Sequence, residues 1–367
     1  MKYLLIIALF FPLACFPQTK ITGRVLNQSD KTPLANASVF LSNATIGTKT
    51  GDDGSFSLNT VRGGQYELVV TMIGHETYRK EIMLTTVNIN LPDILIASKT
   101  TQLSEVKVGA STDWERNYQA FLKDFLGSSS LALQCKILNP EMLNLDYDRA
   151  KRTLTASSYD FLEIENQALG YKIKYLLTRF IKDSKSNFLY FEGSALFENM
   201  EGSAAKKKRW QKKRNEVYAG SSMHFLRSVI ANDMENNHFK VLRLIRKKAP
   251  DYNGFNNKYN QTLVTTPLKT EDFVRLTDNK GLFALTFPDC LYIMYTKKKD
   301  RQNKLGINRP ADAPDYATSI VTFDEPYGFF DNNGIITNPT AILFEGNWGN
   351  SRMAELLPVD FEPGIIK

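Results

Sequence analysis

Histidine is scarce in this chain, which has only three among 367 residues. A zinc peptidase of the carboxypeptidase type needs His-x-x-Glu and a distant third ligand, with one position left open for water. None of His75, His224 and His238 is followed by a glutamate three positions later. The sequence therefore excludes that zinc site, and we expect neither a bound metal nor a cofactor.

The motifs of common hydrolases and nucleotide-binding enzymes are also missing. The chain has no G-x-S-x-G, no Walker A loop and no G-x-G-x-x-G. The nearest constellation, Ser221 with His224, lies within one helical turn, a spacing that favours packing over a catalytic triad. Paired acids such as Glu163 and Glu165 are expected to be solvated strand-edge charges, because sequence gives no separation between them. We therefore expect a non-catalytic protein.

Cysteine and long apolar runs are rare as well. After Cys15 only Cys135 and Cys290 remain, 155 positions apart and in no C-x-x-C pair. Both a disulfide, which export would permit, and two buried free thiols fit this spacing. Beyond the N-terminal segment no apolar run is long enough to span a bilayer, so the sequence predicts no transmembrane helix.

The N-terminal segment 1–18 has the pattern of a secretory signal peptide. Lys2 gives a positive start, residues 3–11 form an apolar run, and Pro12 ends it. We expect cleavage before Gln18 or Thr19, and therefore export to the periplasm or the outer membrane. Cys15 leaves an alternative open, a lipoprotein anchored at that cysteine, although a proline stands where a lipobox has a branched aliphatic residue.

Aromatic residues make up 11% of the chain, and short alternating stretches run through residues 20–97. These stretches predict about seven short strands with turns roughly every ten residues, as in an all-β sandwich. Gly51 to Gly54 is a turn signal, because glycine adopts positive φ and aspartate bonds the local backbone. We expect Val39, Phe56 and Leu68 to point into the core, and the glycine turn to form a hairpin tip.

A dense set of motifs covers the same residues. The pattern is G-x-V, P-L-x-x-A-x-V, T-x-x-D-G-x-F, G-x-Y-x-L and G-[YH]. It is met by Gly23, Val25, Pro33, Leu34, Ala37, Val39, Thr50, Asp53, Gly54, Phe56, Gly64, Tyr66, Leu68, Gly74 and His75. These residues resemble the carboxypeptidase regulatory-like domain. The resemblance implies a non-catalytic Ig-like or transthyretin-like β-sandwich over residues 19–97, a module that in Bacteroidota also begins TonB-dependent receptors.

A linker, residues 98–112, follows this module. Its segment 103–108 resembles the L-x-E-V-x-V that follows the module in TonB-dependent receptors, but here the receptor's plug and barrel do not come next. Residues 113–367 predict a β-rich α+β domain, with a helix from Asp113 to Gly127 and another over 204–231. Segments such as "RWQKKRNEVYAGSSMHFLRSVI" resemble a C-terminal domain of exported Bacteroidota proteins with no defined activity.

One segment carries a charge equal to that of the whole chain, which is +7. Its candidate anionic-surface residues are Lys206, Lys207, Lys208, Arg209, Trp210, Lys212, Lys213 and Arg214. A solvated helix face is the first interpretation. Docking to an anionic envelope polymer or lipid, or to another envelope protein, is the second. Nucleic acid is not expected as the partner of an exported chain, although the basic segment alone would allow it.

Export, a binding-type sandwich and missing catalytic motifs together predict a non-catalytic cell-envelope protein with a binding or scaffolding module. Two alternatives stay open, an envelope hydrolase acting on glycan or peptide and an accessory of TonB-dependent uptake at the outer membrane. A pocket lined by convergent acids would favour the hydrolase, and a shallow aromatic surface would favour binding.

Overall fold

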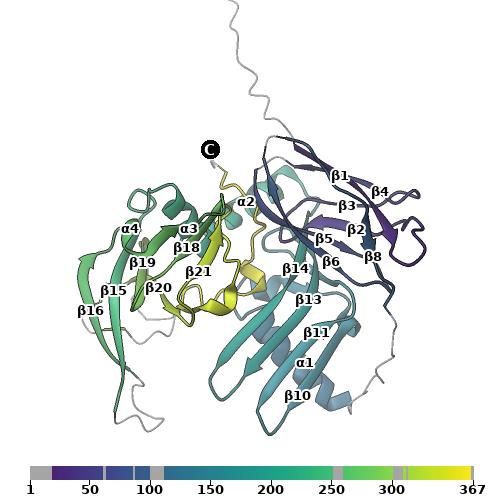
Figure 1. Cartoon of the computed structure of the whole chain (residues 1–367). Coiled ribbons are helices and arrows are strands. Elements are labelled where there is room, and N and C mark those ends of the chain that lie inside the picture. Colours follow the sequence, from purple (N-terminus) through teal and green to yellow (C-terminus); the bar gives the residue numbers. More distant parts are fainter. Residues whose placement is uncertain are drawn as a thin grey trace, which may run out of the picture.

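The chain folds into three β-rich units that meet near its C-terminus (Figure 1). The computed structural model describes residues 19–60, 63–85, 87–99, 111–250, 259–300, 309–310 and 313–364. The expected signal peptide and most of the expected linker lie outside the described residues. The expected fold class is confirmed, because an N-terminal sandwich is followed by a β-rich α+β region.

The N-terminal sandwich consists of two four-stranded sheets that share one core. Its strands are β1 (Thr19–Asn27), β2 (Ser38–Leu41), β3 (Gly47–Lys49), β4 (Ser55–Thr60), β5 (Gly64–Thr71), β6 (Tyr78–Leu84), β7 (Ile89–Asn90) and β8 (Ile94–Ile96). In one sheet β1 pairs antiparallel with β4 and parallel with β7 and β8. In the other sheet the order is β3-β2-β5-β6.

The three expected core residues of the sandwich are confirmed. Val39, Phe56 and Leu68 are all buried in its core. The expected hairpin tip is different: the turn at Gly51 to Gly54 joins β3 of one sheet to β4 of the other, because β4 pairs with β1. Gly54 has a φ of 76°, so the residues do form the expected glycine turn. The strands on its two sides, however, do not pair with each other as in a hairpin.

The central unit is one six-stranded antiparallel sheet with a helix packed on it. Its elements are α1 (Ser111–Phe125), η1 (Ala132–Gln134), β9 (Cys135–Ile137), η2 (Pro140–Met142), β10 (Leu143–Asp148), β11 (Thr153–Ser158), β12 (Leu162–Asn166), β13 (Tyr171–Asp183) and β14 (Phe188–Asn199). The long strand β13 pairs with β14 along one edge and with both β11 and β12 along the other.

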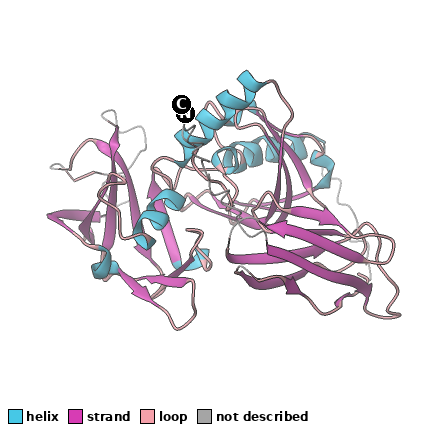
Figure 2. Cartoon of the chain, turned by 90° about the horizontal axis from the view of Figure 1, so that it is seen from above, coloured by secondary structure: helices cyan, strands magenta, loops and turns pink. Residues whose placement is uncertain are grey.

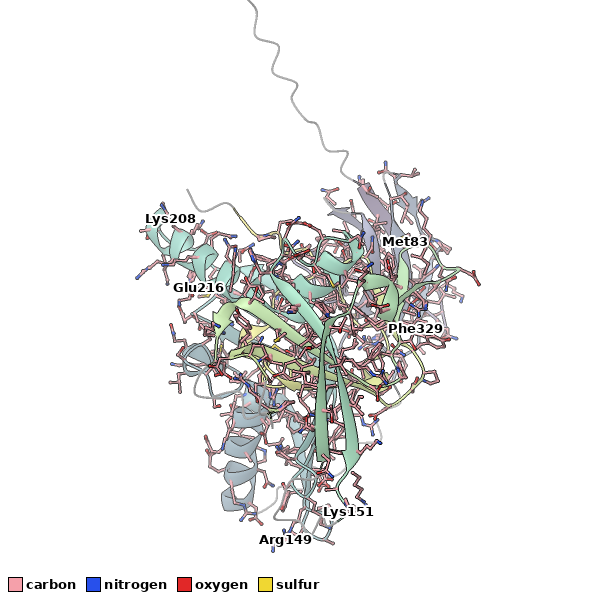
Figure 3. The ribbon with its side chains drawn as sticks, turned by 90° about the vertical axis from the view of Figure 1, so that its left-hand side faces the viewer. Met83, Arg149, Lys151, Lys208, Glu216 and Phe329 are labelled. Atoms are coloured by element: carbon pink, nitrogen blue, oxygen red, sulfur yellow. The ribbon has the colours of Figure 1, made fainter. Side chains whose placement is uncertain are left out.

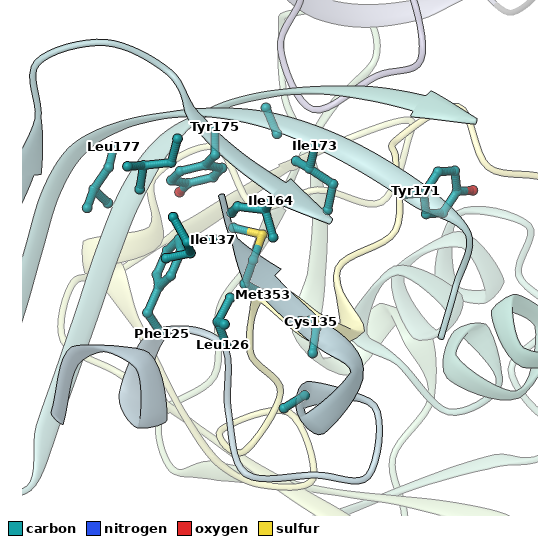
Figure 4. Packing of buried hydrophobic residues seen from close by; sticks show 14 of the residues in the cluster. Phe125, Leu126, Cys135, Ile137, Ile164, Tyr171, Ile173, Tyr175, Leu177 and Met353 are labelled. Carbon is teal, nitrogen blue, oxygen red and sulfur yellow. The ribbon is translucent and has the colours of Figure 1, made fainter. Parts of the chain in front are cut away.

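Helix α1 packs aromatic residues onto this sheet. The rings of Phe121 and Phe125 stack with centroids 4.8 Å apart, and Phe125 meets Tyr175 edge-on at 5.4 Å (Figure 4). These residues have the helical spacing seen in the sequence. The helix starts at Ser111, two residues earlier than expected, so Asp113 lies in its first turn instead of capping it.

The C-terminal unit packs a five-stranded sheet, in the order β16-β15-β19-β20-β22, near a three-stranded sheet, β17-β18-β21. The two sheets share a core with helix α3. Its elements are α2 (Ala204–Tyr218), α3 (Ser222–Ile230), β15 (Phe239–Lys248), β16 (Tyr259–Pro267), α4 (Thr270–Phe273), β17 (Val274–Leu276), β18 (Leu282–Leu285), β19 (Cys290–Lys299), β20 (Tyr316–Phe323), β21 (Gly328–Asp331), η3 (Pro339–Ala341), β22 (Ile342–Gly346) and η4 (Met353–Glu355).

The single helix expected over 204–231 is wrong, because the chain breaks it into α2 and α3. Gly220 has a φ of 84°, and a Cβ there would lie 2.8 Å from the ring of Tyr295. Ser221 then caps α3, its hydroxyl accepting from the backbone N–H of His224. The break is therefore fixed by a glycine conformation followed by a serine N-cap.

A C-terminal segment, residues 353–361, connects all three units. Phe361 packs in the core of the central unit, whereas Val359 packs in the core of the N-terminal sandwich. From α3 of the C-terminal unit, Arg227 donates to the backbone carbonyls of Val359, Phe361 and Asn333 at 2.8, 2.8 and 2.9 Å. Figure 2 shows the C-terminus beside the helices at the middle of the molecule.

The N-terminal sandwich is also bonded directly to the central sheet. The backbone N–H of Asn43 donates to Ala195 of β14 at 2.7 Å, and that of Phe197 donates to Ala44 at 2.9 Å. The loop at 43–44 thus continues the edge of β14 as a short parallel bridge. This part of the β14 edge, at residues 195–197, is consequently covered and is no open template for strand pairing.

A pH-dependent stability follows from Asp331, which lies in the turn that bonds the sandwich. Burial raises the pKa of Asp331 to about 6. The folded state therefore binds the proton of the Asp331 carboxyl more tightly than the unfolded chain does. This binding stabilises the folded state fully below about pH 4, and the stabilisation is lost as the pH rises through about 6. The loss amounts to roughly 2–3 kcal/mol.

We expect Asp331→Asn to remove this contribution. Urea unfolding from pH 4 to 7 should show the wild-type unfolding free energy falling relative to that of the variant. Parallel curves for the two proteins would contradict the assignment.

Candidate functional site

Helix α2 carries the basic segment, and one of its sides is docked on the central unit. The helix starts at a serine N-cap, with the Ser203 hydroxyl accepting from the backbone N–H of Lys206 at 3.3 Å. Its two aromatic residues, Trp210 and Tyr218, are both buried. The docked side is therefore the side that carries the aromatic residues.

Trp210 fills a notch formed by the turn between β12 and β13. Its side chain is 5% exposed, and its Nε1 donates to the carbonyl of Gln167 at 2.9 Å. Gly170 has a φ of 69°, and a Cβ there would lie only 2.1 Å from the indole. Only glycine leaves room for the ring at this position, so the two residues form one structural unit.

Arg214 lies one turn further along the same side. Its Nε donates to Leu169 at 2.8 Å and its Nη2 to Gly170 at 3.0 Å, both through backbone carbonyls. Its guanidinium carbon lies 3.7 Å from the ring centroid of Tyr171, a cation–π contact. Burial lowers the pKa of Arg214. Both Trp210 and Arg214 thus hold the helix to the sheet and are not available to a ligand.

Three further cations of the segment are already engaged. Lys206 lies over the Trp210 ring with its Nζ 4.9 Å from the centroid. Lys207 pairs with Glu201 at 3.3 Å, and Lys213 pairs with Glu216 at 2.7 Å. All four residues of these two pairs are well exposed, so each pair contributes little to stability.

The remaining three cations form what we call the α2 cationic face, defined as Lys208, Arg209 and Lys212. All three are exposed, and none forms an ion pair within the part of the chain that the structure describes. Residues three and four apart lie on one side of a helix, which places these cations together, away from Trp210. Figure 3 shows Lys208 projecting from the molecular surface.

The Ser221 and His224 constellation is a helix cap. The backbone N–H of Gly220 donates to His224 Nδ1 at 3.1 Å, so Nε2 carries the ring proton and donates to Asn237 Oδ1 at 3.1 Å. Burial lowers the pKa of His224, which keeps the ring neutral. The Ser221 hydroxyl contacts the backbone of His224 and leaves the ring nitrogens to other partners.

Cys135 and Cys290 are buried free thiols in two separate cores. Burial raises the pKa of Cys135 to about 12, so its thiol is not ionised near neutral pH. Among the described residues, no group of three or more His, Cys, Asp or Glu side chains could hold a metal ion. No helix in the described ranges is both long and apolar enough to cross a membrane.

The comparisons identify the N-terminal module. Residues 21–108 match the family model of the CarboxypepD_reg-like domain, which confirms the resemblance stated from the motifs. The match continues past residue 97 into the expected linker. No curated protein matches the chain.

Several solved structures are similar over parts of the chain. A cohesin–X-dockerin complex from Acetivibrio cellulolyticus shares 18% identity over 23% of this chain and 62% of its own, with a TM-score of 0.21. A pilus 2b backbone protein of group B streptococcus shares 20% over 22% and 42%, with a TM-score of 0.20. A DUF3823 family protein from Parabacteroides merdae shares 17% over 51% and 82%, with a TM-score of 0.18. The chain spans less than two thirds of the first two, and scores this low carry no functional argument.

The division of the basic segment into structural and exposed residues can be tested by stability. We expect Trp210→Ala to lower the free energy of unfolding by roughly 3–5 kcal/mol, because it empties the notch at Gly170. Lys212→Gln, two residues away on the exposed side, should change it by less than about 0.5 kcal/mol. Urea unfolding of both variants measures the difference. Similar effects of the two substitutions would contradict this docking of α2.

Proposed function

We propose that this is a non-catalytic exported protein of the bacterial cell envelope that binds an anionic envelope polymer or lipid through the α2 cationic face. The observation that carries the proposal is that Lys208, Arg209 and Lys212 are exposed together on a helix anchored by its opposite side. Neither a metal nor a cofactor enters this function.

The chemistry of such a surface is electrostatic. Each cation close to an anionic membrane surface contributes about 1 kcal/mol, and the attraction fades over about 8 Å at physiological salt. Both aromatic residues of α2 are buried, so the helix offers no aromatic ring for insertion into a lipid layer. Binding should therefore be weak, reversible and strongly dependent on salt.

Export is supported by the signal-peptide pattern of segment 1–18. Strand β1 begins at Thr19, so removal of the preceding segment would leave the sandwich whole. A periplasmic or outer-membrane location would bring the cationic face next to phosphate-bearing lipid and polysaccharide.

The binding proposal predicts a localised loss of affinity. Replacing Lys208, Arg209 and Lys212 with Gln should abolish binding to anionic liposomes or lipopolysaccharide at low salt, while folding survives because Gln has a similar helix propensity. The measurement is co-sedimentation at low and at physiological salt.

The matched control changes the net charge equally at another place. Lys240, Lys247 and Lys298 are exposed on β15 and β19, so their replacement with Gln removes the same charge from two strands outside α2. This control should bind like wild type. Equal losses in both triple variants would show that net charge alone drives binding, and no binding by wild type would sink the proposal.

The export proposal predicts a processed N-terminus. Intact-mass analysis of the protein from the envelope fraction should show a mature chain that begins at Gln18 or Thr19. A diacylated Cys15 would instead establish the lipoprotein form. An unprocessed Met1 in the cytoplasm would refute export.

A further inference from the structure

A cavity of about 430 Å³ lies where the three units meet. Its walls come from β5 and β6 of the sandwich, from β13 and β14 of the central sheet, and from the chain after β21, with Val359 of the C-terminal segment beside them. This volume lies within the range of small-ligand pockets, about 300–1,000 Å³. Pockets at junctions between units are a common place for ligand binding.

The sandwich wall of this junction cavity carries two opposed carboxylates. Glu67 of β5 and Glu81 of β6 are direct partners across the antiparallel pair. Like charges in this position repel one another. Arg79 pairs with Glu67 at 2.9 Å, whereas Glu81 accepts the neutral side-chain amide of Gln65, at 3.2 Å. Among the described residues, one of the two opposed charges is thus left without a cation.

The opposite wall adds a third carboxylate. Glu192 of β14 accepts the hydroxyl of Tyr190, and its partner across the sheet is Arg179. Within the described residues neither Glu81 nor Glu192 forms an ion pair. The glutamates lining the cavity therefore outnumber its one lining cation, Arg79.

Asp331 at the end of β21 adds a buried carboxyl to the lining, and the other lining residues are apolar or uncharged. Ile335, Ile336 and Pro339 give an apolar patch on the side of the C-terminal unit. Beside the cavity, Asn333 donates its amide to the carbonyl of Gln65 at 2.8 Å, and its fully buried Oδ1 has no hydrogen-bond partner among the described residues. Asn333 does not line the cavity, so this acceptor belongs to the contact between the units.

We propose that the junction cavity binds an organic cation, a primary ammonium or guanidinium on a short apolar stem. The cation would lie between Glu81 and Glu192, relieving the opposition of Glu67 and Glu81, and the stem would lie against Ile335 and Pro339. A free polyamine and a Lys or Arg side chain of a peptide share this chemistry. The site is separate from the α2 cationic face and does not depend on the proposed function.

Calorimetric titration of the full chain tests the site with spermidine, Nα-acetyl-arginine methylamide and its neutral citrulline analogue. We expect saturable binding of at least one cation and none of the citrulline compound. Spermidine alone would identify a polyamine site, and the arginine compound alone a peptide site. Glu81→Gln and Glu192→Gln should each weaken binding about tenfold, the effect of losing one charge-assisted contact.

Glu163→Gln is the matched control, because Glu163 is exposed on β12 and lines no part of this cavity. It should bind like wild type. Urea unfolding separates binding from folding: without ligand, Glu81→Gln should be at least as stable as wild type, since it removes a like-charge opposition. No saturable binding of any cation, or unchanged affinity in both cavity variants, overturns the proposal. Turnover of chromogenic glycosides that is lost in Glu81→Gln would replace it with catalysis.

Discussion

The arrangement of the three units depends on one guanidinium. Arg227 donates to the carbonyls of Asn333, Val359 and Phe361, which belong to two segments that cross the junction. Each segment in turn bonds the sandwich: Asn333 donates to Gln65, and the backbone of Val359 donates to Asn43. Removing the guanidinium would leave buried carbonyls without donors, a cost that such groups impose when unsatisfied. A side chain of the C-terminal unit therefore helps to hold the sandwich, in addition to the direct bonds between residues 43–44 and β14.

The same C-terminal segment links both candidate sites. Val359 fills the sandwich core and also lines the junction cavity. A few residues later, the carbonyl of Gly364 accepts the side-chain amide of Asn215 on α2, at 2.7 Å. The helix that carries the cationic face and the cavity that carries the carboxylates are thus tied to one stretch of chain. The geometry of both sites therefore depends on the packing of this segment between the units.

What the sequence predicted correctly was local. The sandwich and its core residues followed from alternation and turn motifs, and α1 followed from aromatic spacing. The single helix expected over 204–231 is wrong because Gly220 has a φ of 84°, which breaks the helix although the residues on both sides are helical. The partners of Trp210 and Arg214 could not be predicted, because they lie forty or more residues upstream in the turn at Gly170. A count of charged residues does not distinguish basic residues that hold α2 to the sheet from basic residues that are exposed to solvent.

The junction cavity could not be predicted either, because its walls come from segments far apart in the sequence. Only the pairing of Glu67 with Glu81 was indicated by a sequence motif. Strands β5 and β6 pair symmetrically about Gly74, which has a φ of 79°, so the G-H motif at that turn fixes Glu67 opposite Glu81. Register of this kind follows from the turn, but the facing wall comes from a strand more than a hundred residues away. The net charge of the chain does not indicate an acidic cavity either. The seven basic residues between 206 and 214 equal the whole excess of 46 over 39, so the remainder of the chain is neutral. In that neutral remainder, the acidic residues of the cavity are balanced by basic residues elsewhere in the chain. The net charge therefore does not reveal the acidic cavity, which only the fold brings together.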